Sequence, residues 1–544
     1  MRARVRVPGW AAAAGLAILA LAAALTGLRN GFTLDDVPIV AGNARVHTLA
    51  QPWKTFALPY WPSGGGSPGL YRPFGILGFA LQWAVGGGKP VVFHAVNLTL
   101  AVGVTLAVYA LARRLLSASG AWIAAALFAV HPVHVEVTAN VVGQLELAVT
   151  LLLCVAVTAY LRWRGAGHLS ARHIAGLAAL YAAACLFKDT GFMLPALLLA
   201  AEWLVVADPR GLSQRVRALM PVYGALAVVA AGYLAARTAV TGTLAGDLPL
   251  AWLAALSPWA RFCTMLSVVP QWLRLLVWPA WLSPTYTPPV MPIYQSLAGA
   301  PLLGLGLVGL AGLVFAIGLR RDRRVSFGIG WFALAVFPVS NVLLVSGVFL
   351  AERSLFLPSV GAMLVVGLAA ARMLEARMPA VRVLAGTVAG AAIVLGAYRS
   401  ASRQREWKDN ETLFAQATID RPDSYAAWWD YGTALFQAGK FGSGERALRR
   451  AIELHDRNPL LLEELAGHYR EARMCWPAIA LYEKALALAP THSKSRVALV
   501  DCLLMVGDTS KARRVASAGV ALGDTTTALH RWGAMPGSGA RRAQ

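Results

Sequence analysis

Two adjacent carboxylates, Asp35 and Asp36, stand out in the first three quarters of the chain. Acidic side chains are scarce there, because residues 1–398 contain 11 Asp and Glu against 28 Lys and Arg. Neighbouring carboxylates raise each other's pKa, so one of the two could act as a general base while the other accepts hydrogen bonds. The alternative is a charged cap at the end of the apolar segment that precedes them.

Other ionisable side chains stand in short polar breaks between apolar segments, where they could bind an anion such as a phosphate. His131 and His134 are three residues apart and could instead hold a metal ion. No further Cys or His lies near them and no known zinc motif matches, so we predict no metal site. Ion pairs that only seal helix ends are the alternative for the charged residues. The candidate binding residues are Arg72, His94, His131, His134, Glu136, Glu146, Lys188, Asp189, Glu352 and Arg353.

The composition indicates which elements position these groups. The chain has 544 residues, 57% hydrophobic and 14% charged, whereas globular chains are about 45–50% apolar and about 25% charged. A membrane span needs about 17–25 apolar residues. The sequence predicts an all-α, polytopic membrane bundle over residues 1–398, with eleven spans near 10–28, 91–111, 121–138, 145–161, 173–187, 191–207, 218–236, 301–319, 327–346, 355–371 and 380–398.

The region 238–300 leaves the number of spans open between eleven and twelve. Its apolar stretch 260–279 would add a twelfth crossing, and a missed partner near 249–256 is a further alternative. Several Pro and Trp residues flank that stretch, which favours an interfacial or re-entrant helix.

Basic clusters predict the orientation of the spans. With the N-terminus in the cytoplasm, 18 of the 28 basic residues before residue 399 fall in short cytoplasmic segments. The loops 31–90 and 238–300 and everything after the last span then lie outside the cytoplasm, as in a bacterial inner or cell membrane. A cleaved signal peptide is the alternative reading of the N-terminus. Because the net charge of +22 arises largely from membrane-flanking clusters, we predict no nucleic-acid partner.

The tail carries an internal repeat. A connector, 399–421, leads to a region in which residues 34 apart match in type, for example Gly432, Ala466 and Val500. Such a period is typical of tetratricopeptide repeats, which stack into a solenoid and often bind peptides. We predict about three repeats over 422–523 and a disordered tail over 524–544. A purely structural array is the alternative.

Several short motifs occur in a characteristic order. Asp35-Asp36, Tyr71-Arg72-Pro73, Phe93-His94-Ala95-Val96-Asn97 and His131-Pro132-Val133-His134-Val135-Glu136 come first, and Lys188-Asp189-Thr190-Gly191 and Ala351-Glu352-Arg353-Ser354 follow. This order resembles the transmembrane-and-tetratricopeptide-containing glycosyltransferases of the C-type superfamily and their bacterial relatives. The resemblance covers roughly residues 31–520.

The resemblance implies a polyprenyl-phosphate-linked sugar as donor and a Ser or Thr hydroxyl of an extracytoplasmic protein as acceptor. It implies Asp36 as the catalytic base, with Asp35 as the alternative, and inverting attack on the sugar. Arg353, Lys188 and Arg72 would hold the leaving phosphate. The remaining candidate residues would line the sugar or phosphate site.

The sequence departs from the family at two positions. Relatives usually carry Arg where Gln144 stands, and the Lys-Glu pair common in relatives is Lys188-Asp189 here. A lost positive charge could change donor choice or weaken activity. The Gln144 change therefore leaves open a non-catalytic membrane-anchored scaffold that recruits proteins through its repeats. A transporter of lipid-linked sugars is a further alternative, although we detect no inverted repeat of spans.

Overall fold

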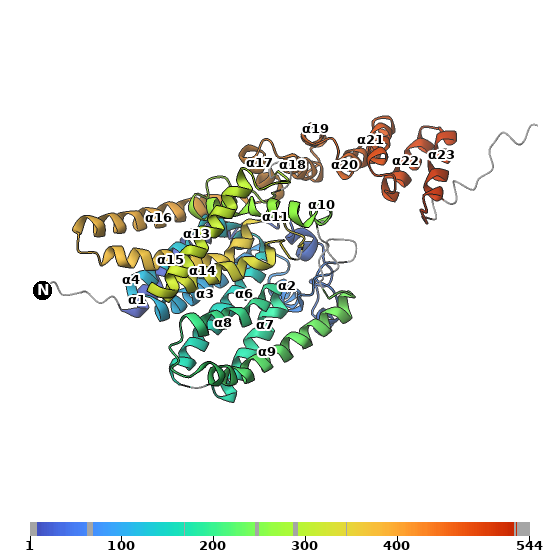
Figure 1. Ribbon diagram of the computed structural model, residues 1–544. Coiled ribbons are helices and arrows are strands. Elements are labelled where there is room, and N and C mark those ends of the chain that lie inside the picture. The colour runs from blue at the N-terminus through green and yellow to red at the C-terminus, as the bar shows by residue number, and fades with distance from the viewer. Residues whose placement is uncertain are drawn as a thin grey trace, which may run out of the picture. The chain divides into compact units, whose positions relative to one another are not determined.

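The computed structural model describes residues 8–62, 69–167, 169–244, 250–286, 292–343, 345–526 and 529. Every regular element in these ranges is helical, which confirms the predicted all-α class (Figure 1). The chain divides into a first unit, Met1–Leu413, and a second unit, Phe414–Gln544. Asp247 and most of the predicted tail lie outside the described residues.

The first unit contains sixteen described α-helices, and a seventeenth, α17, crosses into the second unit. They are α1 (Gly9–Ala24), α2 (Pro73–Gly86), α3 (Pro90–Leu115), α4 (Ala118–Ala129), α5 (Val135–Ala139), α6 (Gln144–Gly165), α7 (Ala171–Phe187), α8 (Leu194–Leu204), α9 (Leu212–Thr241), α10 (Ala251–Ala254), α11 (Pro258–Leu266), α12 (Val268–Val277), α13 (Ala300–Arg321), α14 (Arg323–Val336), α15 (Phe356–Leu374), α16 (Pro379–Glu406) and α17 (Asn410–Asp420).

Each predicted span overlaps a helix, but fewer helices are long enough to cross a membrane. Among the described residues seven helices qualify by length and composition, and the pair α4 with Pro132–Ala139, bent by 50°, would make eight. The predicted eleven to twelve spans exceed this count because α7, α8 and α14 have only 17, 11 and 14 residues. A 3₁₀ turn, Asp189–Met193, separates α7 from α8, and another, Phe337–Val339, ends α14.

Small residues let the central helices approach closely. α15 packs against both α4 and α14. A Cβ on Gly361 would lie 2.3 Å from the carbonyl oxygen of Gly328, so any side chain there would push the two backbones apart. Close backbone packing is what holds helices together in lipid, where burial of apolar side chains gives little advantage. The resulting bundle is a firm support for the polar segments between its helices.

The stretch 260–279 forms two short helices rather than one span. α11 and α12 have 9 and 10 residues, and each buries one face, with Cys263 and Trp272 turned inward. Trp259, Trp278 and Trp281 are more than half exposed. Aromatic side chains of this kind are typical of the membrane interface, so the arrangement fits the interfacial prediction.

The second unit repeats with the predicted period. Its helical pairs are α18 (Tyr425–Gln437) with α19 (Phe441–Leu454), α20 (Pro459–Glu471) with α21 (Cys475–Leu488), and α22 (Ser493–Met505) with α23 (Thr509–Ala521), and they follow one another in Figure 1. Both the first and the second helices of successive pairs begin 34 residues apart. Ala466 and Val500, from the matching rows of the sequence, are buried between helices. The tetratricopeptide-like array is therefore confirmed.

Candidate functional site

One cavity of about 630 Å³ in the first unit is lined by four carboxylates and three cations. Its walls come from the loop after α1, the turn before α6, the Asp189–Met193 turn and the start of α15. Seven of the twelve predicted site residues line it, although they are far apart in the sequence: Asp35, Arg72, Glu136, Glu146, Lys188, Asp189 and Arg353.

The two adjacent aspartates have different environments. Asp35 lines the cavity, and its carboxylate has no hydrogen-bond or ion-pair partner among the described residues. Asp36 is fully buried and does not line it. The Asp36 carboxylate accepts hydrogen bonds from the backbone N–H groups of Val142 (2.8 Å), Val141 (3.0 Å) and Thr33 (3.3 Å). Asp36 therefore anchors the loop to the turn before α6 and leaves Asp35 facing the cavity.

Burial also sets the protonation behaviour of Asp36. Desolvation raises the pKa of Asp36 to about 7, even though the hydrogen bonds from Val141 and Val142 lower it. The nearby charge of Asp35 raises this pKa further. Near neutral pH, Asp36 thus exchanges between a charged anchor with three donors and a neutral acid.

Arg353 and Glu136 form a close ion pair in the lining of the cavity. The Arg353 guanidinium lies 2.6 Å from the Glu136 carboxylate, and the Arg353 backbone N–H donates to the same group at 2.8 Å. Glu136 is buried on the bent segment after α4, whereas about a third of the Arg353 side chain is exposed. One carboxylate thus positions both the backbone and the side chain of residue 353.

The other two cations of the cavity, Lys188 and Arg72, also contact carboxylates, but Arg72 shares its carboxylate with another arginine. Lys188 contacts Glu146 on the first turn of α6. Arg72 lies 3.6 Å from Asp189, but Asp189 also pairs with Arg237 at 3.0 Å. Since a second guanidinium already neutralises Asp189, the charge of Arg72 is the one most available to a ligand.

The cations are close enough to affect one another. Burial, and then the neighbouring charges of Arg72 and Arg353, lower the pKa of Lys188 well below its ordinary value, while Asp189 and Glu136 raise it. An anion bound among the three would relieve this repulsion. The cavity is thus electrostatically suited to a negatively charged group.

Four predicted binding residues lie away from the cavity and have structural partners. His131 and His134 contact the backbone carbonyls of Leu276 and Phe128 at 2.9 Å, and the second nitrogen of His134 contacts the Ser359 hydroxyl. His94 contacts the carbonyl of Gly31 at 3.2 Å.

The carboxylate of Glu352 accepts hydrogen bonds from the Ser283 backbone N–H (2.6 Å) and the Tyr286 hydroxyl (3.0 Å). His94, His131, His134 and Glu352 therefore lie outside the cavity lining, and each uses at least one polar atom to hold segments together. His94 Nδ1 and one carboxylate oxygen of Glu352 are buried without a hydrogen-bond partner among the described residues, and contact of these four side chains with substrate stays a prediction.

Gln144 has a structural partner too. Its side-chain amide exchanges two hydrogen bonds of 2.8 Å with Gln82 on α2, and its NH₂ also donates to the carbonyl of Phe93. Both amides are buried. At the position where relatives usually carry Arg, this chain therefore has a buried pair of amides that satisfy each other's hydrogen bonds.

The cavity also includes uncharged polar groups that could not be singled out from the sequence. Tyr60, Thr150 and Thr190 line it, and their buried hydroxyl oxygens have no hydrogen-bond partner among the residues that the structure describes. Thr and Tyr are common residues, and only the fold shows that these three face one space. Unsatisfied buried hydroxyls are rare and favour a polar ligand.

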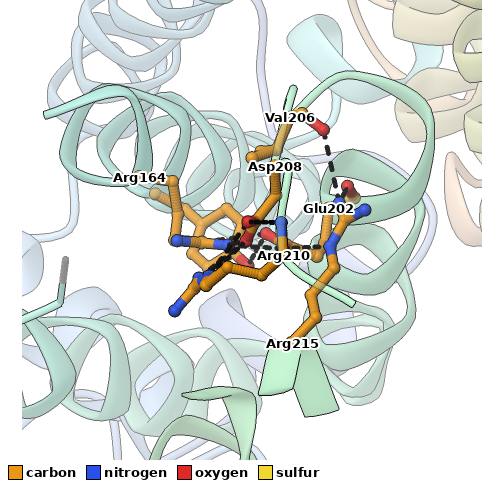
Figure 2. A network of polar contacts seen from close by, with 7 residues as sticks. Arg164, Glu202, Val206, Asp208, Arg210 and Arg215 are labelled. Carbon is orange, nitrogen blue, oxygen red and sulfur yellow. Dashed lines mark hydrogen bonds and ion pairs between the residues drawn. The ribbon is translucent and has the colours of Figure 1, made fainter. Parts of the chain in front are cut away.

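A second charge network lies at the other end of α6. Arg164 is eighteen residues beyond Glu146, about 27 Å along the helix axis. Its guanidinium contacts Glu202 and Asp208, each at 2.6 Å, and Arg215 lies 2.8 Å from Glu202 (Figure 2). Figure 2 shows Arg210 on Asp208 as well. Every carboxylate here is paired, and the network closes the ends of α6, α8 and α9.

Comparisons with known families match two parts of the chain. Residues 79–234 match the family described as dolichyl-phosphate-mannose-protein mannosyltransferase, and residues 465–531 match the tetratricopeptide repeat. The first range includes four of the charged residues that line the cavity: Glu136, Glu146, Lys188 and Asp189. It also includes Tyr233, whose hydroxyl donates to Asp189.

Individual relatives extend the similarity along the chain. Protein O-mannosyl-transferase Tmtc2 of Drosophila melanogaster is 36% identical over 51% of this chain and 31% of its own length. Protein O-mannosyl-transferase TMTC3 of Homo sapiens is 26% identical over 81% of this chain and 50% of its own. Protein O-mannosyl-transferase Tmtc1 of Drosophila melanogaster is 27% identical over 81% of this chain and 61% of its own length. These matches confirm the resemblance found in the sequence, and the chain spans about a third to three fifths of the length of these relatives.

A solved structure is similar at a lower level. The archaeal oligosaccharyltransferase AglB from Archaeoglobus fulgidus, in complex with an inhibitory peptide and a dolichol-phosphate, superposes with a TM-score of 0.43 and 16% identity over 73% of this chain and 55% of its own.

Proposed function

We propose that this chain is a membrane glycosyltransferase that moves a sugar, with mannose the first to test, from a polyprenyl-phosphate carrier to a hydroxyl group of a protein. The observation that carries the proposal is the cavity in which an unpartnered carboxylate, Asp35, is grouped with three cations. The match of residues 79–234 to a mannosyltransferase family supports the donor class. The names of the relatives support a protein hydroxyl as acceptor.

The size and charge of the cavity suit a sugar phosphate. Ligand sites commonly have volumes of about 300–1,000 Å³, and this one has about 630 Å³. The anionic phosphate would lie by Arg72, Lys188 and Arg353, where it can replace part of their contacts with carboxylates. The unpaired hydroxyls of Tyr60, Thr150 and Thr190 would contact the sugar.

The roles of the two aspartates follow from their partners. A general base must reach the proton that it removes and must have a lone pair available. Asp35 lines the cavity, where an acceptor hydroxyl could reach it, and its carboxylate has no partner among the described residues. Asp36 is fully buried outside the cavity lining and accepts from three backbone donors. We therefore assign the base to Asp35, the alternative in the sequence interpretation, and give Asp36 the anchoring role.

The proposed reaction is a single displacement. Asp35 takes the proton of the acceptor hydroxyl as its oxygen bonds to the anomeric carbon, and the bond from that carbon to the phosphate oxygen breaks. The electron pair leaves with the lipid phosphate, whose growing charge Arg353, Lys188 and Arg72 stabilise. Attack from the opposite face inverts the anomeric configuration. Among the described residues no group of three or more His, Cys, Asp or Glu side chains forms a metal-binding cluster.

The setting of this reaction is also part of the proposal. Long apolar helices make the first unit an integral membrane domain. The basic clusters support a cytoplasmic N-terminus with the cavity and the repeats on the opposite side. The repeat array would then present acceptor proteins, as tetratricopeptide arrays commonly bind peptides.

The test is transfer by the purified full chain in lipid vesicles, with radiolabelled polyprenyl-phosphate mannose and a mixture of Ser- and Thr-containing proteins. We expect labelled protein with the wild type and about 10²–10⁴-fold slower labelling with Asp35→Asn. A wild-type chain that binds exported proteins but transfers no sugar would support the scaffold function instead.

A further inference from the structure

The backbone of the loop that carries Asp35 is in an unusual conformation. Leu34, directly before Asp35, has φ +48°, in the left-handed region. Residues with branched or bulky side chains rarely adopt it, and such strain persists only where surrounding contacts enforce it. The contacts that enforce it at Leu34 therefore also fix the direction of Asp35.

A contact that holds Leu34 in this conformation comes from a residue near the C-terminal end of the first unit. The Leu34 N–H donates to the side-chain oxygen of Asn410, the first residue of α17, at 2.8 Å. Three residues earlier, the Gly31 N–H donates to the carbonyl of Lys408, also at 2.8 Å. The Asn30 side chain donates to the Gln404 carbonyl at 2.7 Å. The segment that follows the last span thus holds the loop after the first span along its length.

Asn410 is not needed to cap its own helix. The N–H of Thr412 donates to the carboxylate of Asp409 at 2.8 Å, so Asp409 supplies the cap of α17. The Asn410 side chain is therefore directed to Leu34 without serving the local helix. This separates its contact with the loop from a general role in folding.

We propose that Asn410 is a positioning residue for the reaction, acting through Leu34 to hold the Asp35 carboxylate toward the cavity. This inference rests on the proposed function, since it concerns the base assigned there. Without the Asn410 acceptor, Leu34 relaxes to negative φ, and the following residue turns away from the acceptor hydroxyl. The effect belongs to the chemical step and leaves donor binding unchanged.

The variant series uses kinetics in vesicles as in the transfer assay. Asn410→Ala should lower kcat about tenfold, the rate effect of losing one hydrogen bond, with the donor KM within about twofold. Asn410→Asp should keep near wild-type kcat because a carboxylate oxygen also accepts from Leu34. Leu34→Gly in the Asn410→Ala background should restore kcat, because Gly adopts positive φ without strain.

A matched control and a second readout exclude a general folding effect. Asn458 caps α20 in the repeat unit by accepting from Leu460 at 3.0 Å, and Asn458→Ala should leave kcat unchanged. Hydrogen exchange of the peptide containing Leu34 should accelerate in Asn410→Ala and not in Asn458→Ala. Unchanged kcat and exchange in Asn410→Ala, or a loss of kcat that Leu34→Gly does not restore, would overturn the inference. Transfer retained by Asp35→Asn would instead overturn the proposed base.

A separate observation concerns two thiols in the repeat unit. Cys475, at the start of α21, and Cys502, on α22, bring their sulfur atoms within 3.0 Å, and both side chains are buried. α21 belongs to the second repeat and α22 to the third, and the two helices pack together. A disulfide has an S–S distance of about 2.0 Å, so a shift of about 1 Å would bring the pair to bonding distance.

We infer that Cys475 and Cys502 are a disulfide site that links the second repeat to the third. The two thiols lose two protons and two electrons, and a disulfide-containing oxidant accepts them and becomes two thiols. Burial raises the pKa of Cys502, and the thiolate is the reactive form. Oxidation is therefore tested on chain that is refolded in the presence of the oxidant.

Peptide mapping after alkylation tests this inference on the full chain, refolded with glutathione disulfide. We expect a linked peptide containing Cys475 and Cys502, two hydrogens lighter than its reduced components, which is lost in Cys502→Ser and kept in Cys263→Ser. Complete alkylation of both cysteines in the refolded wild type would overturn the inference.

Discussion

The ion pair between Arg353 and Glu136 allows the catalytic and structural roles of one cation to be separated. Arg353→Ala removes a guanidinium at 2.6 Å from a carboxylate that is only 2% exposed. Breaking a fully buried pair costs about 3–5 kcal/mol. The Arg353 backbone N–H still donates to Glu136, and a third of the Arg353 side chain is exposed. We therefore expect a loss of about 2–3 kcal/mol in the free energy of unfolding.

The double variant Arg353→Ala/Glu136→Gln removes the uncompensated charge. A glutamine oxygen can still accept from the backbone of residue 353, so the free energy of unfolding should return to within about 1 kcal/mol of wild type. Transfer should not return, because no cation remains by the leaving phosphate. Loss of one donor to a developing anion lowers kcat by about 10²–10³-fold, and we expect this reduction in both variants.

The assays are thermal unfolding in detergent and single-turnover transfer in vesicles with saturating donor. Glu136→Gln alone is the matched control, because it retains the cation and should lose less transfer than either Arg353 variant. If the double variant recovered both stability and transfer, Arg353 would have only a structural role and the assignment of the phosphate site would be refuted.

Three further predictions concern the anchor, the cavity wall and the second charge network. Because burial places the pKa of Asp36 near 7, above the value of about 4 expected in the unfolded chain, the folded state binds more protons between these values. The wild-type melting temperature should therefore fall as the pH rises from about 4 to about 7 relative to Asp36→Asn, and parallel pH profiles would contradict the raised pKa. A Cβ on Gly143 would lie 2.1 Å from the carbonyl oxygen of Val137, so Gly143→Ala should displace the turn that holds Asp36 and abolish donor binding. Gly165→Ala at the other end of α6, where a Cβ meets nothing within 4 Å, should bind donor normally, and equal effects would exclude a local cause. Glu202→Ala leaves Arg215 without a carboxylate and Arg164 with Asp208 alone, and it should cost about 3–5 kcal/mol of stability without changing transfer per folded molecule. Glu375→Ala, at an exposed carboxylate, should change neither, and a kinetic defect in folded Glu202→Ala would show that the network is more than structural.

The sequence revealed much of the charged lining of the cavity because carboxylates are scarce between the apolar segments. An ionisable group near the membrane is costly and is retained where it is used. For that reason Glu136, Glu146, Lys188 and Arg353 could be singled out by their types and positions alone. Their grouping in one cavity depends on helix packing, which the sequence pattern does not show.

The choice between Asp35 and Asp36 could not be made from the sequence. Adjacent residues point in different directions, and which one faces the cavity depends on the left-handed φ of Leu34 and on donors more than 100 residues away. The positions of the two histidines relative to the cavity could not be predicted for a related reason. A neutral imidazole can satisfy backbone carbonyls as well as bind a ligand, and His131 and His134 do the former.

The predicted number of spans exceeds the number of described helices that are long enough to cross a membrane, because hydropathy does not show where a helix stops. The apolar segments on the two sides of the 3₁₀ turn at Asp189–Met193 form α7 and α8, which have only 17 and 11 residues. In contrast, the 34-residue period of the tail was fully visible, because each repeat places small residues at the same helix crossings.

We propose that Asp35 is the base of a sugar transfer in this cavity. This role can be tested by single-turnover transfer from polyprenyl-phosphate mannose by Asp35→Asn, with donor binding and melting temperature measured on the same preparation. We predict unchanged melting temperature and donor binding, with transfer reduced by about 10²–10⁴-fold, the usual contribution of a general base. Transfer by Asp35→Asn at the wild-type rate would contradict the claim.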